Sequence, residues 1–193
     1  MKLLGISGSL SIRSKTFLAV EKAVEFARAS GPGIDAVVLN LADFQMQFCD
    51  GRAPHLYEGD TKVLIDQIVS ADAFIIGTPV YRGSITGVLK NLFDVIPNDA
   101  LRGKVIGFIA TGGTYHHFLA IEHQLHPIAG YFSAFVVPGG VYAHNEHYAD
   151  GELTSPEIIG RLKALGESVV EIRQRLGGGF IGVEKPLIPR KSL

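Results

Sequence analysis

Short apolar runs alternate with longer segments of helical periodicity along most of this 193-residue chain. The runs are rich in β-branched and aromatic residues and end at Gly, Pro or Thr-Gly turns, which is typical of buried β-strands. They predict five strands, at residues 2–7, 34–39, 73–77, 105–110 and 135–137.

Helices are predicted between and after these strands. Segment 16–30 places its apolar residues on one helical face, and segment 86–96 repeats that pattern before it stops at Pro97. Ser155-Pro156-Glu157 has the residues of a helix start, and the helix that follows is predicted to run to about residue 176.

Alternating apolar strands and helices predict a parallel sheet with helices on both faces. For five strands in a chain of this length, we expect the flavodoxin-like, three-layer α/β/α arrangement of an α/β protein, with a five-stranded parallel sheet. This domain covers residues 1–176, and residues 177–193 form a C-terminal tail. The apolar residues of the tail are compatible with an arm that packs on a neighbouring subunit or with a loose end.

Composition narrows the function. The net charge of −1 provides no basic surplus for binding nucleic acid, and it also argues against an acidic electron carrier that docks basic partners by charge. Cys49 is the sole cysteine, which excludes an internal disulfide and a cysteine-based zinc site. The sequence shows neither a signal peptide nor an apolar stretch that could span a membrane, so we expect a cytoplasmic protein.

Three loops follow the predicted strands at the edge where ligands bind in such sheets. The first, residues 7–16, is rich in hydroxyls, carries two cations and leads into a helix N-terminus, which suits a terminal phosphate. It matches neither the Gly-x-Gly-x-x-Gly nor the Walker A pattern. The alternative is an ordinary serine-rich loop with a capping serine.

The other two loops suit a planar ligand. Residues 77–84 place Tyr81 and Arg82 between Gly and Pro residues, and an aromatic beside backbone donors can cover a flat ring. Residues 111–114 contain two glycines that allow close approach of the backbone. Each loop on its own is also compatible with a simple turn.

Together, Gly8-Ser9, Thr78-Pro79-Val80-Tyr81-Arg82-Gly83-Ser84, Gly87-Val88-Leu89-Lys90 and Ala110-Thr111-Gly112-Gly113-Thr114 resemble the NAD(P)H-dependent FMN reductases. The sequence is most similar to the branch that supplies reduced flavin to alkanesulfonate monooxygenases. The resemblance covers roughly residues 1–176. It implies FMN and NAD(P)H as cofactors, a homodimer or homotetramer, and a partner monooxygenase.

The resemblance also assigns roles to residues. The FMN phosphate would be held by Ser9, Ser14, Lys15 and Thr16. The isoalloxazine ring would be lined by Pro79, Val80, Tyr81 and Arg82, and its pyrimidine side by Thr111, Gly112, Gly113 and Thr114. Two positions depart from the family pattern: Ser11 stands where an arginine is frequent, and His123 stands where some sulfonate-linked members have tyrosine.

The flavin carries the redox chemistry, so no general acid or base is required, and Arg82 is the candidate for an electrostatic catalytic role. Tyr115 and His123 are predicted to wall the exposed flavin edge at a subunit interface. His116, His117, His123 and His126 lack the spacing of a zinc protease, so no metal is expected, and His144 and His147 are expected on the surface.

We therefore predict an NAD(P)H-dependent reduction of FMN to FMNH₂ for a partner monooxygenase. One alternative is a reductase that retains FMN and reduces quinones or azo dyes. The other alternative is a flavodoxin-type electron carrier, which is not an enzyme.

Overall fold

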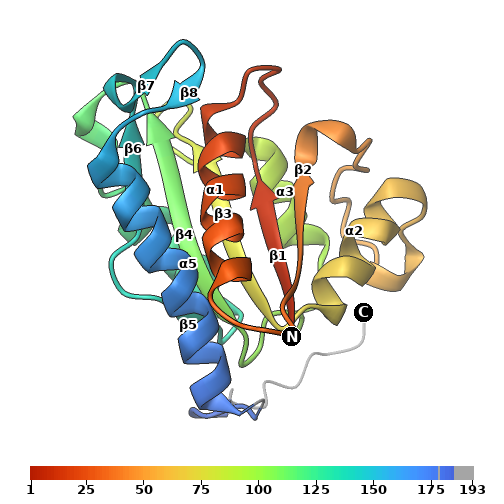
Figure 1. The fold of residues 1–193 in the computed structure, drawn as a ribbon. Helices are drawn as coiled ribbons and strands as arrows, with labels where there is room; N and C mark the ends of the chain where they lie inside the picture. Colours follow the sequence, from red (N-terminus) through yellow and green to blue (C-terminus); the bar gives the residue numbers. More distant parts are fainter. Residues whose placement is uncertain (178, 185–193) are drawn as a thin grey trace.

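The computed structural model describes residues 1–177 and 179–184, and it contains a central sheet whose strands all run parallel (Figure 1). The order of the strands is β2-β1-β3-β4-β5, and β6 also pairs with β4. This is the flavodoxin-like order, so the predicted fold is confirmed. The strands are β1 (Lys2–Ser7), β2 (Asp35–Asn40), β3 (Ala73–Pro79), β4 (Val105–Gly112), β5 (Phe135–Val136) and β6 (Val141–His144).

Helices cover both faces of the sheet, each over its own apolar core. One core joins the sheet to α1 (Lys15–Ala29) and α5 (Pro156–Leu176). The other core joins it to α2 (Gly59–Ser70), α3 (Gly87–Val95) and α4 (His126–Tyr131). The strands between the two cores are buried on both sides, and this explains why their sequences read as continuous apolar runs.

Local signals in the sequence set the starts of three helices. The side chains of Ser14, Thr86 and Ser155 each accept a hydrogen bond from a backbone N–H in the first turn of α1, α3 and α5. Gly166 of α5 lets that helix approach α1 closely, because a Cβ atom there would lie 2.4 Å from the carbonyl oxygen of Ala23. The α1–α5 layer would therefore have to move apart to accept any larger residue at this position.

The fifth strand differs from its prediction because it consists of two pieces. Phe135–Val136 pairs with the start of β4, and Val141–His144 pairs with its end. The Pro138-Gly139-Gly140 turn interrupts the strand between them, and the sequence pattern had placed the end of the strand there. The sequence pattern did not predict α2, α4 or the short hairpin of β7 (Tyr148–Ala149) and β8 (Glu152–Leu153).

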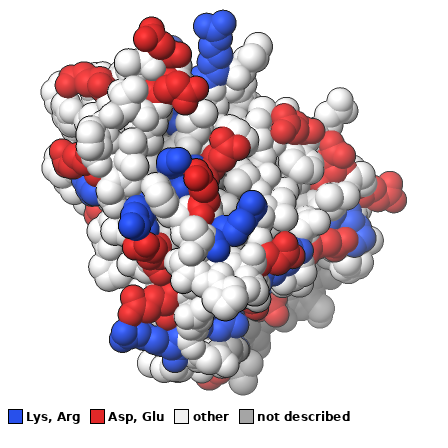
Figure 2. Space-filling model, in the orientation of Figure 1, with Lys and Arg blue, Asp and Glu red and all other residues white. Residues whose placement is uncertain are grey.

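The described part of the tail returns to its own chain. The guanidinium of Arg102 lies 3.9 Å from the ring centroid of Phe180 and forms an ion pair with Glu184. Residues 185–193, which hold the rest of the predicted arm, lie outside the described residues. Within the described ranges, no helix has the length and apolarity needed to cross a membrane. Positive and negative side chains are interspersed over the face shown in Figure 2.

Candidate functional site

Four strands end around one cavity of about 220 Å³ at the carboxyl edge of the sheet. The parallel register brings these ends together, since Ser7 aligns with Gly77 of β3, and Gly112 of β4 aligns with His144 of β6. The cavity is lined by Ser9, Ser11, Arg13, Ser14, Lys15, Thr16, Pro79, Val80, Tyr81, Thr111, Gly112, Gly113 and Asn145.

The loop from β1 to α1 forms the cationic side of the cavity. Ser9 Oγ accepts a hydrogen bond from the N–H of Ser11 at 3.2 Å, and Ser14 Oγ accepts one from the N–H of Phe17 at 3.0 Å. Helix geometry leaves the N–H groups at the start of α1 without acceptors inside the helix, and their dipoles favour an anion. The first turn of α1 holds no acidic residue.

Two side chains of this loop are tied to other strand ends. The hydroxyl oxygens of Thr16 and Thr111 lie 2.6 Å apart and are buried. Lys15 Nζ donates to Asn145 Oδ1 at 2.9 Å, and the hydroxyl of Tyr148 donates to the backbone oxygen of Lys15 at 3.0 Å. Burial raises the pKa of the Tyr148 phenol well above its usual range, so this donor keeps its proton.

The loop after β3 is a tight turn that forms the second wall. Tyr81 and Ser84 exchange backbone hydrogen bonds of 2.9 and 3.1 Å, and Arg82 and Gly83 both have positive φ angles, of 53° and 84°. This is the geometry of a type I′ turn, which suits Gly83 and strains Arg82. The N–H of Val80 donates to the oxygen of Thr111 at 2.8 Å, which fixes this wall against β4.

The loop after β4 is held by side chains from β6. The hydroxyl of Tyr142 donates to the oxygen of Thr114 at 2.6 Å, and His144 Nε2 lies 2.9 Å from the oxygen of Gly113. The ring of His144 also stacks on Tyr115, with centroids 4.3 Å apart. A Cβ atom on Gly112 would lie 2.0 Å from the Tyr142 hydroxyl, so this approach requires glycine.

The structure brings most of the predicted binding residues to the cavity, while Arg82 and Thr114 stand beside it rather than in its lining. Tyr115 lies at a neighbouring cavity of about 380 Å³, and His123 lines neither of the two. Ser11, Arg13 and Asn145 line the cavity but were not predicted as site residues. The cationic, serine-rich loop could have indicated Ser11 and Arg13, whereas Asn145 follows a strand that the sequence analysis missed.

The histidines require one correction. His144 was expected on the surface, but only 8% of it is exposed. It lies in a polar stretch of sequence, which reads as a surface loop, and its burial follows from the pairing of β6 with β4. Across the described part of the chain, no group of three His, Cys, Asp or Glu side chains is arranged to hold a metal ion.

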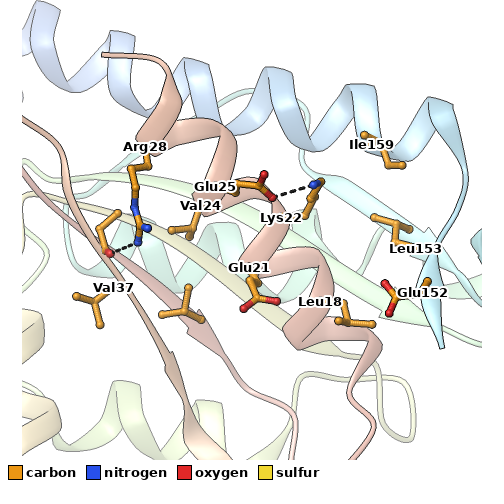
Figure 3. Close-up of a pocket in the computed structure, with 12 residues that line it drawn as sticks. Leu18, Glu21, Lys22, Val24, Glu25, Arg28, Val37, Glu152, Leu153 and Ile159 are labelled. Atoms are coloured by element: carbon orange, nitrogen blue, oxygen red, sulfur yellow. Dashed lines mark hydrogen bonds and ion pairs between the residues drawn. The ribbon is translucent and has the colours of Figure 1, made fainter. Parts of the chain in front are cut away.

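A larger cavity, of about 720 Å³, lies between α1, β2 and β8, away from these strand ends (Figure 3). Three of its charged side chains already have partners within the chain. Lys22 forms a 2.8 Å ion pair with Glu25, and Arg28 donates to the oxygen of Ala36 at 2.6 Å. We therefore assign no ligand to it.

The cavity at the strand ends fits a phosphate joined to a flat ring. Arg13, Lys15, the hydroxyls and the α1 N-terminus surround one end, and no described lining residue is acidic. Pro79, Val80 and Tyr81 provide a flat wall at the other end, next to the backbone of Gly112 and Gly113. FMN carries both of these groups, so the residues present fit it.

Comparisons with known proteins agree with this geometry. Residues 1–148 match the family model described as NADPH-dependent FMN reductase. The chain is 49% identical over 182 residues to an "NAD(P)H-dependent FAD/FMN reductase" of Geobacillus thermodenitrificans, covering 94% of this chain and 98% of that protein. It is 31% identical to the "NADH-dependent FMN reductase SfnF" of Pseudomonas putida, covering 88% and 91%.

A solved structure of an NADH:FMN oxidoreductase in its apo form has the same fold, with a TM-score of 0.78, 24% identity and 89% coverage of both chains. The family match spans most of the chain, and the relatives match it along nearly their whole length. The chain therefore belongs to the NADPH-dependent FMN reductase family, whose members are oxidoreductases that use FMN and NAD(P)H.

Proposed function

We propose that this protein reduces FMN with NAD(P)H at the cavity of the strand ends, and that FMNH₂ then leaves to supply a flavin-dependent monooxygenase. The lining of the cavity carries the proposal, because it places cations and hydroxyls at one end and the wall from Pro79 to Tyr81 at the other. A flavin gripped at one end and on one face remains exposed enough to exchange.

The binding roles follow from the lining. The start of α1, with Ser9, Ser14 and Lys15, binds the phosphate, and Arg13 adds a second cation. The loop after β3 supports one face of the ring through Pro79, Val80 and Tyr81. The backbone of the loop after β4 faces the pyrimidine edge of the ring.

The bound flavin supplies the hydride-accepting chemistry, and the chain positions it. The wall from Pro79 to Tyr81 covers one face of the ring and leaves the other face for the nicotinamide. Backbone N–H groups at the loop after β4 stabilise negative charge that develops on the pyrimidine edge. Arg82, exposed beside this wall, contributes a positive charge near the ring or near a nicotinamide phosphate.

The partner and the assembly are part of the proposal. The SfnF relative is named an NADH-dependent FMN reductase, and this likeness supports a role in supplying reduced flavin. Exposed apolar side chains, including Leu10, Ile12, Tyr115, Phe118 and Leu119, lie in loops near the carboxyl edge of the sheet. Contact between subunits would cover them, so we propose a dimer or tetramer, working in the cytoplasm where reduced nicotinamide is available.

A steady-state assay of NAD(P)H oxidation with and without added FMN, FAD or riboflavin tests the function. We expect oxidation to depend on added flavin, with FMN preferred to riboflavin because of the phosphate site. A protein that stays yellow after desalting and reduces quinone without added FMN would instead be a flavin-retaining reductase. The absence of NAD(P)H oxidation under all conditions would leave only an electron carrier.

A further inference from the structure

The carboxyl end of β6 holds two buried side chains that both reach the loop after β4. Side chains two residues apart on a strand share a face, and this places Tyr142 and His144 together. Tyr142 donates to the oxygen of Thr114, and His144 Nε2 lies 2.9 Å from the oxygen of Gly113. Two successive peptides of one loop are therefore fixed by two neighbouring residues of another strand.

The surroundings of His144 determine which of its nitrogens donates. Its Nδ1 accepts the N–H of Glu146 at 3.2 Å, so the neutral ring carries its proton on Nε2. Nε2 is therefore the nitrogen that donates to the oxygen of Gly113.

By binding the carbonyl oxygens of Gly113 and Thr114, these two donors also set the direction of the N–H groups in the same two peptides. In a trans peptide the N–H points away from the C=O. The N–H groups of Thr114 and Tyr115 therefore point away from the side chains of Tyr142 and His144. Gly113, which precedes them in the same loop, lines the cavity. Neither N–H has an acceptor among the described residues.

We propose that His144 and Tyr142 are positioning residues, which hold these two N–H groups ready for the pyrimidine edge of the flavin. The inference rests on the proposed function, because it needs the flavin in this cavity. Preorganised donors stabilise charge that develops during a reaction, and here the loop is fixed before the flavin arrives. Stacking of Tyr115 on His144 further restrains the same loop.

Three variants separate the donors from the packing. Tyr142→Phe removes one hydroxyl, His144→Phe keeps an aromatic ring against Tyr115 without a donor, and His144→Gln keeps a donor without the ring. Tyr131→Phe is the matched control, because it removes a hydroxyl that donates to Asn98 at 3.1 Å, outside the cavity.

We expect Tyr142→Phe and His144→Phe to lower kcat at least fivefold with FMN and with riboflavin alike, because the phosphate is not involved. His144→Gln is expected to recover most of the loss. The reduction potential of the bound flavin is expected to fall in both Phe variants. If the protein's preference for reduced over oxidised flavin falls tenfold, the potential falls by about 30 mV. Tyr131→Phe is expected to match the wild type in each measurement.

Amide NMR spectra of the flavin-free protein give a readout that is independent of turnover. The Thr114 and Tyr115 signals are expected to shift in the Phe variants, while the Val80 signal stays in place. The inference is overturned if kcat and the reduction potential of the bound flavin are unchanged in the Phe variants. It is also overturned if the Thr114 and Tyr115 signals do not shift, or if His144→Gln is no more active than His144→Phe. If His144→Phe does not fold, Tyr142→Phe decides. A wild-type protein without flavin-dependent NAD(P)H oxidation would instead overturn the proposed function.

Discussion

The hydroxyl groups of Thr16 and Thr111 form a buried hydrogen bond of 2.6 Å, which joins the first turn of α1 to the end of β4. Only 1% of Thr16 and 5% of Thr111 is exposed. The bond therefore connects the phosphate side of the cavity to the side that faces the ring, and it uses the Thr16 hydroxyl within the protein. Thr16 retains its backbone N–H for an anion.

This pair predicts non-additive stability. Thr16→Val or Thr111→Val alone leaves a buried hydroxyl without its partner, which is expected to lower the free energy of unfolding by about 1–3 kcal/mol. The double variant removes both hydroxyls and is expected to be more stable than the sum of the single losses predicts. Urea unfolding of the four proteins measures the coupling, and strictly additive losses would contradict it.

Ser14 is predicted to combine a structural and a binding role. Ser14→Ala removes the cap of α1 and is expected to cost about 1 kcal/mol of stability. It is also expected to raise the apparent FMN constant about tenfold or more, and Ser9→Ala is expected to do the same, while riboflavin turnover stays nearly unchanged. Thermal unfolding and flavin kinetics measure the two effects.

Ser155→Ala is the matched control for Ser14, because Ser155 caps α5 in the same way and does not line the cavity. It is expected to lower stability without changing the FMN constant. Equal losses with FMN and riboflavin in the Ser9 and Ser14 variants would show that the loop does not recognise the phosphate.

Arg82 occupies a strained backbone position that glycine adopts without strain. A glycine substitution can therefore remove the charge of Arg82 without a large loss of stability. Arg82→Gly relieves the positive φ angle, so stability is expected to stay within about 1 kcal/mol of the wild type. The lost charge is expected to lower kcat/KM at least about tenfold, as in Arg82→Ala, with partial recovery in Arg82→Lys. Chemical denaturation and steady-state kinetics test both expectations.

Ser133→Gly is the control for this substitution. Ser133 also has a positive φ angle, of 56°, and donates its N–H to the oxygen of Gly130 at the opposite edge of the sheet from the cavity. It is expected to leave the kinetics unchanged. If the kinetic constants for FMN and NAD(P)H are unchanged in Arg82→Ala, Arg82 has no role at the site.

Lys104 predicts a pH dependence of stability. Burial lowers the pKa of Lys104 from 10.5 to about 8, although its Nζ donates to the oxygens of Ile68 and Val69. Between pH 8 and 10.5 the unfolded chain binds more protons at this residue than the folded chain, so its contribution to stability rises with pH. Urea unfolding at pH 7.5 and about 9.5 is expected to show a smaller rise in Lys104→Arg, which stays charged. The same rise in both proteins would contradict the assignment.

The proposed assembly predicts that a substitution at an exposed apolar residue lowers the mass of the protein in solution. The wild type is expected to be a dimer or tetramer by light scattering at micromolar concentration, and Phe118→Glu is expected to shift it towards the monomer. Phe118 is 56% exposed in the loop after β4. Phe48→Glu, in an exposed position of another loop, serves as the control. A fully active wild-type monomer would contradict the proposal.

The sequence predicted the parts of the fold with strong local signals. Apolar runs predicted β1, β2, β3 and β4. Helical periodicity predicted α1 and α3, and the start at Ser155-Pro156 predicted α5. The strand β6 was missed because Pro138, Gly139 and Gly140 separate it from β5, and turn residues read as the end of a strand. The helix α2 was missed because it starts at Gly59 without a side-chain cap.

In the candidate site, too, residues with local sequence signals were predicted and residues placed by long-range pairing were not. Loops that directly follow predicted strands supplied most of the lining, because the ends of parallel strands meet at one edge. Asn145, Tyr142 and His144 were missed because their positions depend on a long-range pairing with β4. No local pattern in the sequence shows that a histidine in a polar segment becomes buried by that pairing.

The interruption at Pro138-Gly139-Gly140 leaves the outer edge of the sheet mechanically discontinuous. The half next to Phe135 belongs to the rigid base of the sheet, and the half that carries His144 belongs to the binding edge. Displacement of one half need not be transmitted along a single strand to the other. The position of His144 against the loop after β4 is therefore set by the pairing of Val141–His144 with the end of β4, independently of the half at Phe135.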